Sequence, residues 1–334
     1  MDITFFLRSK QGAISIGKLF RPLIAEIGKT ENVETYYMPS ATYGVKGMLQ
    51  NLWFTFKHRN KKGINHITGE CHFIILALLG CKTVLTIHDL GFYVDHKHEM
   101  SWLKRKFIYY LQIYWPIKLA DKVIAISEKT KQEILETVPF KRKIDFAKHV
   151  SIDAFPYTPK KMYKNHIRIM QCGTAPQKNL ETTIKALQGM ECELRVVREM
   201  TEKQKKLAKE CGVAYTNVYN LTDEEMTAEY QNADIICMPS LYEGFGAMVI
   251  EGQATGRPVI TTDLEPMKSI SGGAAHLLKN PKDESELKTA IQKIINDDDY
   301  RTDLIERGKE NASKYKLENC AKEHLEIYKL LNIK

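Results

Sequence analysis

The chain has 334 residues, 43% of them hydrophobic and 27% charged, which is the composition of a globular protein. A single hydrophobic core rarely grows beyond about 250 residues, so this length predicts two domains. No apolar run approaches the roughly 20 residues that a membrane-spanning helix needs, because the longest, 73–85, is interrupted by Lys82. We therefore do not expect a helical integral membrane protein.

The cysteines and the amino terminus both indicate a reducing compartment. The seven cysteines are odd in number and contain no Cys-x-x-Cys pair, which predicts free thiols rather than disulfides or a zinc site. The segment MDITFFLRSKQG has no basic stretch ahead of its apolar residues and no small-residue cleavage site, so it predicts a first strand rather than a signal peptide. We expect a cytoplasmic protein.

The net charge of +8 is concentrated in the first half of the chain. Residues 1–160 contain 24 Lys and Arg against 14 Asp and Glu, a net of +10, whereas residues 161–334 contain 25 against 27, a net of −2. This asymmetry predicts an anionic partner, either phosphates or the inner face of the cell membrane, unless the surface is simply basic. Nucleic acid is not expected, because no recognition motif accompanies the basic residues.

Strand-like and helix-like segments alternate along the chain, a pattern typical of parallel sheets with crossover helices. In the first half the predicted strands are 3–7, 33–38, 64–67, 83–87 and 122–126. Helices are predicted to begin between them, near residues 15, 46, 71, 101 and 128. In the second half the predicted strands are 167–171, 194–197, 214–219, 235–238 and 258–261, with only helices after about residue 283.

A linker separates the two halves. Residues 155–165 contain two prolines and no apolar periodicity. We expect an α/β protein with two doubly wound parallel-sheet domains, 1–158 and 159–315. The last helix, within 316–334, has apolar residues at helical spacing and needs a surface to pack on.

Residues 235–263 predict a strand, a glycine-rich loop, a helix, a turn and a strand. Ligands of open α/β sheets bind beyond the carboxyl ends of the strands, where a helix N-terminus offers N–H groups to anionic oxygens. Gly244 and Gly246 remove side chains where a ligand must approach the backbone. The carboxylates of Glu243 and Glu251 only accept hydrogen bonds, so they suit the paired hydroxyls of a sugar or a ribose.

Three stretches of this segment, 242–246, 249–251 and 254–260, closely resemble the signature of retaining GT-B glycosyltransferases of family 4, the glycosyl transferases group 1. The resemblance implies two Rossmann-like domains facing across a cleft, with the C-terminal helix crossing back to the N-terminal domain. It also implies that Glu243 contacts the donor sugar and that Glu251 holds the ribose. The loop amides implied to meet the sugar and the diphosphate belong to Gly244, Phe245, Gly246 and Ala247.

A second segment, QCGTAPQKNL at 171–180, resembles the phosphate-binding turn of the same family. The resemblance places Gly173 and Thr174 near the phosphates and Lys178 beside the departing diphosphate. A fixed cation there stabilises charge that grows in the transition state. Many family members have an arginine at the position of Thr174, so the usual paired cation is missing from this chain.

Two further sites are implied in the first half. Residues 86–90 (TIHDL) resemble the histidine-aspartate turn of the family, so His88 is expected to face the sugar and to donate to a hydroxyl or position the acceptor. Gly12 lies where the family brings a glycine-rich turn against the phosphates. His96 and His98 lack metal-ligand spacing, and we expect neither metal nor cofactor, the nucleotide-diphosphate sugar being a substrate.

Residues 101–118 combine aromatic and basic side chains, and the basic run 57–62 precedes them. This composition predicts a helix on a membrane surface, although the same apolar residues would also serve to pack on the sheet. A membrane-facing first half makes a lipid-linked acceptor reasonable.

The resemblance implies a metal-independent hexosyltransferase that retains anomeric configuration and acts on a glycan or lipid-linked acceptor in polysaccharide or glycolipid synthesis. A nucleotide-sugar epimerase and a catalytically silent GT-B subunit that binds a partner transferase remain alternatives. A glycosidase using Glu243 and Glu251 would leave Lys178 without a role.

Overall fold

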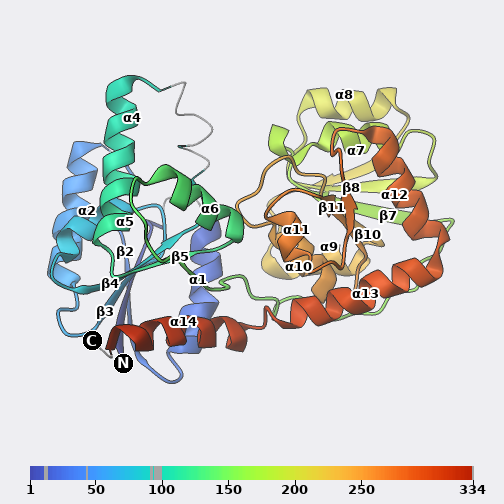
Figure 1. The fold of residues 1–334 in the computed structure, drawn as a ribbon. Coiled ribbons are helices and arrows are strands. Elements are labelled where there is room, and N and C mark those ends of the chain that lie inside the picture. Colours follow the sequence, from blue (N-terminus) through green and yellow to red (C-terminus); the bar gives the residue numbers. More distant parts are fainter. Residues whose placement is uncertain (11–13, 43, 91–92, 94–99, 333–334) are drawn as a thin grey trace. The chain divides into compact units, whose positions relative to one another are not determined.

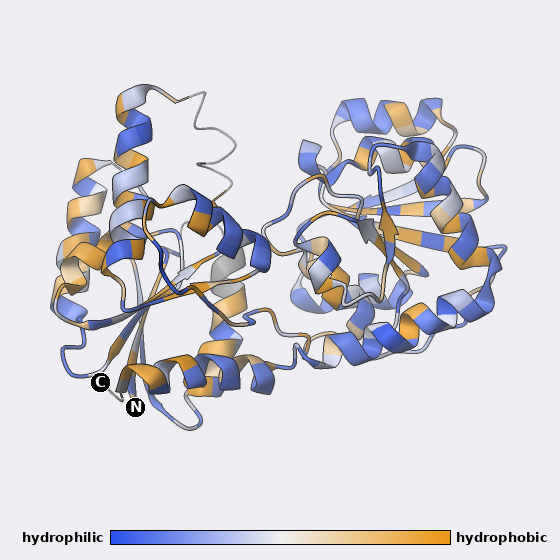
Figure 2. Ribbon diagram, viewed as in Figure 1, coloured by the Kyte–Doolittle hydropathy of each residue, from blue (hydrophilic) through white to orange (hydrophobic). Residues whose placement is uncertain are grey.

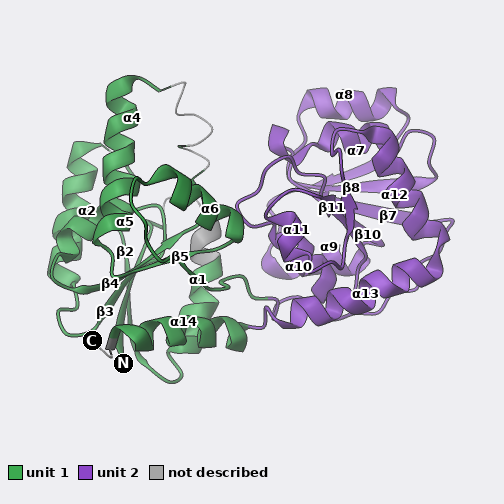
Figure 3. Ribbon diagram, in the orientation of Figure 1, with its two compact units in different colours: residues 1–151, 317–334 green, residues 152–316 purple. Residues whose placement is uncertain are grey.

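The computed structural model describes residues 1–10, 14–42, 44–90, 93 and 100–332, and the chain folds into two compact units (Figures 1 and 3). Unit 1 comprises residues 1–151 and 317–334, and unit 2 comprises residues 152–316. Gly12, His96 and His98 lie outside the described residues.

Unit 1 is built on a parallel sheet whose described strands follow the order β2-β1-β3-β4-β5-β6. Five of the strands were predicted, with ends that differ by a residue or two. The two-residue β6 was not predicted. The strands are β1 (Asp2–Leu7), β2 (Asn32–Tyr37), β3 (Ile64–Ile67), β4 (Lys82–Ile87), β5 (Lys122–Ala125) and β6 (Asp145–Phe146).

Helices cover both faces of this sheet. One buried core lies under α2, η1, α5 and α6, and a second lies under α1 and α14. The predicted helix over 101–118 is a continuous helical stretch with π-helical hydrogen bonding in its middle. The helices of unit 1 are α1 (Ile14–Ile27), α2 (Val45–His58), η1 (His72–Leu78), α4 (Trp102–Ile108), η2 (Tyr109–Tyr114), α5 (Trp115–Leu119), α6 (Glu128–Thr137) and α14 (Leu317–Asn332).

The last helix packs on unit 1, which confirms that the chain returns to its first domain. The hydroxyl of buried Tyr328 is hydrogen-bonded to Nδ1 of His66 at 2.6 Å. Nε2 of the same ring is 2.8 Å from the Thr86 hydroxyl. Lys148 pairs with Glu323 of α14. The apolar face of α14, including Ala321, Ile327 and Leu331, is buried in the core that α1 also covers.

Four buried or partly buried histidines gather around the ring of Phe20 in unit 1. Burial lowers the pKa of each below the ordinary 6.5, to about 4 for His88, because a charged imidazolium would lose its hydration there. We call this group the histidine cluster: His66, His88, His149 and His324.

Unit 2 repeats the design with parallel strands in the order β12-β11-β10-β7-β8-β9, again counting described residues. Figure 2 shows hydrophobic strands in the middle of both units, as expected for sheets covered on two faces. The three-residue β12 was not predicted. The strands are β7 (Ile167–Cys172), β8 (Cys192–Val197), β9 (Ala214–Val218), β10 (Ile235–Cys237), β11 (Val259–Thr262) and β12 (His276–Leu278).

The helices of unit 2 position the loops that follow its central strands. α7, α8 and α12 pack on one core of the sheet. α10 lies close to the strands because Gly252 has no side chain: a Cβ there would lie 2.8 Å from Ile236 and 3.1 Å from Val259. The helices are η3 (Pro176–Lys178), α7 (Leu180–Ala186), α8 (Glu202–Glu210), α9 (Asp223–Asn232), α10 (Ala247–Ala254), α11 (Met267–Ile270), α12 (Glu284–Asn296) and α13 (Asp298–Ser313).

The units divide at residue 151, before the boundary at 158 that the prolines suggested. Residues 152–158 have no regular structure but are bound to unit 2. The Phe155 ring packs edge-on against Tyr230 at 5.2 Å, and the Thr158 amide donates to Thr255. Arg257 donates to the Thr158 carbonyl at 2.8 Å. The segment is therefore an ordered part of unit 2.

Candidate active site

The residues predicted from the two motifs of unit 2 converge at the carboxyl ends of β7 and β10, which are adjacent strands. The ammonium of Lys178, just after β7, donates to Oε1 of Glu243, in the loop after β10, at 2.6 Å. Both side chains are partly shielded, with 25% and 13% of their surface exposed. Shielding of this kind keeps a charge pair in place until a polyanion competes for the lysine.

Several backbone contacts fix the position of Lys178. Gly173 has a φ of +104°, and a Cβ there would lie 2.7 Å from Cγ of Lys178, so glycine is required for the lysine to cross it. Gln171 donates to the Lys178 carbonyl at 2.7 Å. Asn179, with a φ of +58°, donates to the carbonyls of Pro239 and Pro281 at 3.1 and 2.6 Å. The lysine-bearing turn is thus tied to the loop after β10.

Glu251 lies on the inner side of α10, where the Tyr230 hydroxyl donates to its Oε2. Burial raises the pKa of Glu251, while the Tyr230 hydrogen bond and the charge of Lys178 partly oppose this rise. Tyr230 is fully buried, so its hydroxyl has a fixed place. The carboxylate is therefore oriented before any ligand binds, with one oxygen already engaged.

The glycine-rich loop ends at the N-terminus of α10. Gly246, with a φ of +93°, is the N-cap, and Ala247 opens the helix. This end of a helix attracts anionic groups. The side chain of Phe245 is only 7% exposed and lies edge-on to Tyr315 at 6.0 Å, so the ring belongs to the packing of the unit. The predicted contact between Phe245 and a ligand is thus limited to its backbone.

The side chain of Thr174 is short and uncharged, so it does not replace the arginine that many family members have at this position. Its hydroxyl donates to the Glu199 carbonyl at 2.8 Å, and its own carbonyl accepts from Gln204 at 2.8 Å. Thr174 therefore joins the turn after β7 to the turn after β8.

His88 belongs to unit 1 and lies at the carboxyl end of β4. Its Nε2 is 2.7 Å from the Thr68 carbonyl, and burial lowers its pKa to about 4, so the ring is neutral at pH 7. A carbonyl only accepts, hence Nε2 carries the proton and Nδ1 is left as an acceptor. The expected donation from His88 to a sugar hydroxyl is thereby corrected: this ring can accept a hydrogen bond from a hydroxyl.

His88 lines a cavity of about 670 Å³ in unit 1. Polar residues that follow β1, β3 and β4 form one side of it, including the ion pair of Arg8 with Glu70. The stretch α4 to η2 contributes the apolar side chains of Phe107, Ile108 and Ile113, together with the polar ones of Lys104 and Gln112. Such a cavity suits a molecule that has a polar end and an apolar body.

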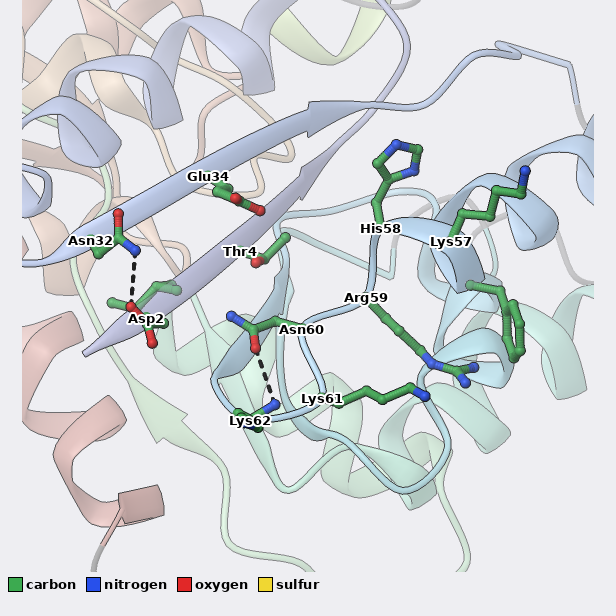
Figure 4. A pocket seen from close by; sticks show the side chains of 12 residues that line it. Asp2, Thr4, Asn32, Glu34, Lys57, His58, Arg59, Asn60, Lys61 and Lys62 are labelled. Atoms are coloured by element: carbon green, nitrogen blue, oxygen red, sulfur yellow. Dashed lines mark hydrogen bonds between the residues drawn. The ribbon is translucent and has the colours of Figure 1, made fainter.

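A second pocket, of about 720 Å³, lies at the opposite end of the strands of the same sheet (Figure 4). Asp2 and Asn32, the first residues of β1 and β2, line it and are hydrogen-bonded to each other at 2.9 Å. Its basic side chains come from 57–62, at the end of α2. Because it lies at the amino ends of the strands, it is separate from the carboxyl-end sites described above.

Among the described residues no three His, Cys, Asp or Glu side chains gather as metal ligands would. Two residues that matter for the site were not found from the sequence. Tyr230 sits in the mainly polar helix α9, and Arg198 follows a strand without a motif around it. Only the fold brings them to Glu251 and Cys172.

Two family profiles match the chain. The profile described as Glycosyl transferases group 1 matches residues 160–311, and that described as Glycosyltransferase Family 4 matches residues 43–146. The first covers the sheet of unit 2, and the second covers unit 1 from α2 to β6. The two Rossmann-like units define the GT-B fold, and the chain belongs to the group 1 glycosyltransferases.

Individual relatives agree with this assignment. Over 285 residues the chain is 22% identical to the O-antigen chain mannosyltransferase B of Escherichia coli, covering 75% of this chain and 71% of that protein. It is 36% identical to the D-inositol 3-phosphate glycosyltransferase of Corynebacterium urealyticum, but over 109 residues, 32% of this chain and 26% of the relative. HepE from Anabaena, solved in complex with UDP-glucose, superposes with a TM-score of 0.77 at 13% identity, covering 98% of this chain and 99% of HepE.

Proposed function

We propose that this protein is a retaining hexosyltransferase that needs no metal and that moves a sugar from a nucleotide-diphosphate sugar to the hydroxyl of a glycan or a lipid-linked acceptor. The observation that carries this proposal is the pair of Lys178 and Glu243, held 2.6 Å apart beside the N-terminus of α10. A cation binds a phosphate and a carboxylate accepts hydrogen bonds from sugar hydroxyls, so the pair suits a ligand in which a sugar is joined to a phosphate.

Each group of the site has a distinct task in this reaction. The diphosphate, on entering, takes Lys178 as a partner and releases Glu243 to accept hydrogen bonds from the sugar hydroxyls. As the sugar–phosphate bond breaks, the lysine stabilises the charge that develops on the departing oxygen. Glu251, already oriented by Tyr230, accepts from the ribose hydroxyls. The departing phosphate takes the acceptor proton, so the chain mainly orients and stabilises charge.

The cavity beside His88 is the proposed acceptor site. Nδ1 of His88 accepts from a hydroxyl there, and the apolar side next to Phe107 and Ile108 faces the body of a lipid or the less polar face of a sugar. This arrangement supports a lipid-linked acceptor.

Unit 1 also has a surface that supports contact with an anionic membrane. Along one face of α2 lie four exposed apolar side chains, with exposed fractions from 53% to 74%: Val45, Leu49, Trp53 and Phe56. Lys57 lies over the Trp53 ring at 3.9 Å. None of the residues of α4, all of which the structure describes, is buried. Basic groups beside exposed aromatics bind anionic lipid surfaces.

The structure divides the apolar residues of 101–118 between two roles. Ile113 and Ile117 pack in the core of unit 1, whereas Trp102 and Leu103 are 58% and 72% exposed. Packing on the sheet is thus confirmed for Ile113 and Ile117, and the exposed Trp102 and Leu103 support the proposed membrane contact. Within the described residues no helix combines the length and the apolarity that crossing a bilayer requires.

Vesicle co-sedimentation tests the membrane proposal. We expect the protein to bind vesicles containing phosphatidylglycerol, less so at high salt, and Trp53→Ser to weaken this binding. Tyr163→Ser in unit 2 is the matched control, because Tyr163 is also 60% exposed and also lies near a lysine. Equal binding of both variants and of the wild type would contradict the proposal.

The donor is tested by thermal shift with UDP, GDP and ADP, since only a bound ligand stabilises the fold. Transfer is then assayed with the sugar of the stabilising nucleotide, with and without EDTA, and the anomeric configuration of the product is read by NMR. Product formed without an acceptor would indicate an epimerase instead. Activity that appears only after a partner transferase is added would indicate a silent subunit.

A further inference from the structure

Arg198 has a backbone conformation that arginine rarely adopts. It follows β8 with a φ of +102°, whereas the other non-glycine residues of positive φ in the described chain, Glu70, Asn179 and Asn220, have φ between +49° and +58°. A bulky residue in such a conformation is strained, and strained residues of this kind concentrate at functional sites. A glycine would adopt it without cost.

The neighbouring strand holds this conformation in place. The Arg198 amide donates to the Val218 carbonyl at 2.8 Å. Asn217 donates to the Arg198 carbonyl at 2.6 Å, and its oxygen accepts from the Met200 amide at 3.1 Å. Asn217 thus bonds the chain on both sides of Arg198. These hydrogen bonds maintain the strained conformation, so a function of the arginine side chain would explain why the strain is kept.

The guanidinium of Arg198 is directed toward the site of Lys178 and Glu251. β7 and β8 are paired with Cys172 opposite Val197, so Arg198 lies beside the turn that starts at Gly173. Its guanidinium is close enough to the Cys172 thiol to oppose the rise of the pKa of that group. Burial raises the pKa of that thiol to about 11, Glu251 adds to the rise, and Arg198 and Lys178 oppose it.

The four side chains of Arg198, Lys178, Glu251 and Cys172 are therefore neighbours. A thiol sulfur is a weak acceptor, so Cys172 does not compete with phosphate oxygens for the guanidinium. The turn that bears Thr174 is fastened to the Arg198 turn by the Thr174–Glu199 hydrogen bond. An anion bound at Lys178 thus has a second cation within the same group of side chains.

We infer that Arg198 binds the diphosphate of the donor and supplies, from β8, the second cation that this chain lacks at Thr174. The inference rests on the proposed function. Lys178 meets the diphosphate as a single charge, whereas a guanidinium offers two parallel N–H groups to phosphate oxygens. Two cations from adjacent strands then stabilise the leaving group together.

The variant Arg198→Gly tests this role because it should raise the thermal stability of the protein while it lowers the affinity for the nucleoside diphosphate. Removing the strain is expected to raise the melting temperature of the free protein. Losing the guanidinium is expected to weaken binding of the nucleoside diphosphate by about 10- to 100-fold, the usual effect of a lost hydrogen bond to a charged group. Binding of the nucleoside monophosphate should change less, and that of the nucleoside least.

Two more variants keep the test informative. Arg198→Lys keeps the charge without the paired donors and should bind the diphosphate with intermediate affinity. Lys206→Ala is the matched control, because Lys206 is a 79% exposed cation of α8 and should leave affinity unchanged. Affinities are measured by isothermal titration with UDP, GDP or ADP, whichever binds the wild type.

The outcomes separate this inference from the function on which it rests. If the wild type binds none of the three diphosphates, the proposed function fails. If the wild type binds one of them and Arg198→Gly binds it equally well, the role of Arg198 alone is overturned. Equal losses for the diphosphate and the bare nucleoside would also overturn it, since Arg198 would then contact the base or the ribose.

Discussion

The proposed site requires that the side chain of Lys178 pass directly over the Cα of Gly173, where there is no room for a Cβ. Gly173→Ala places a methyl group 2.7 Å from Cγ of Lys178 and 3.1 Å from its Cδ and Cε. Carbon atoms in ordinary contact are about 3.5–4.0 Å apart, so the lysine must move by roughly 1 Å. Its ammonium lies 2.6 Å from Glu243, and a movement of that size breaks the pair.

The effects on stability and activity should differ in size. An alanine with φ near +104° costs about 1–3 kcal/mol of unfolding free energy. A misplacement of about 1 Å in a catalytic group costs about 100-fold in rate. We therefore expect a folded, moderately destabilised enzyme whose kcat falls about 100-fold and whose affinity for the nucleoside diphosphate also falls.

Gly189→Ala provides the matched control. Gly189 has a φ of +74°, and a Cβ there would meet no atom within 4 Å, so this variant has backbone strain without the clash. Urea denaturation should give both variants similar losses of stability, and initial rates should fall in Gly173→Ala alone. Wild-type turnover by Gly173→Ala would refute the placement of Lys178 in the reaction.

Three further predictions concern carboxylates, a hydroxyl and pH. Glu243→Ala should abolish transfer while nucleotide still binds, whereas Glu251→Ala should mainly weaken nucleotide binding; titration and initial rates distinguish the two, and full turnover by Glu243→Ala would refute the assignment. Tyr230→Phe should lose about 1–3 kcal/mol of unfolding free energy, measured in urea, because the partly buried Glu251 loses its donor. The histidine cluster should make unit 1 unstable in acid: its folded pKa values are lowered, so the unfolded chain binds more protons below pH 6.5. Stability is full above pH 6.5 and should fall as the pH drops toward 4, with His88 alone contributing about 1.4 kcal/mol per pH unit; a flat profile would contradict this.

The fold was largely predictable because its strands are buried on both faces. Parallel strands covered by helices are nearly continuous apolar runs, and β10, with three apolar residues that are all buried, shows this. β6 and β12 have two and three residues, too few for a pattern. The domain boundary was placed late because prolines indicate irregular backbone, and irregular backbone at 152–158 is nonetheless bound to unit 2.

The candidate site was predictable only where it lies within motifs. Glu243 and Glu251 belong to one continuous segment, so their shared location follows from the strand-loop-helix pattern. The tautomer of His88 depends on the Thr68 carbonyl, which comes from another strand, and no local pattern shows it. Tyr230 was missed for the same reason, because a tyrosine in a mainly polar helix does not indicate which carboxylate it will contact.

Thr174 and Arg198 show why a motif can lose a residue while the site keeps its charge. Neighbouring strands of a sheet lie about 4.8 Å apart, and their carboxyl ends open on the same edge. A long side chain can therefore reach one phosphate from either strand, and the sequence separation between β7 and β8 has no bearing on that distance. The requirement at this edge is for positive charge near the departing oxygen. An arginine held at a φ of +102° after β8 meets that requirement, at the cost of backbone strain that an arginine at position 174 would not need.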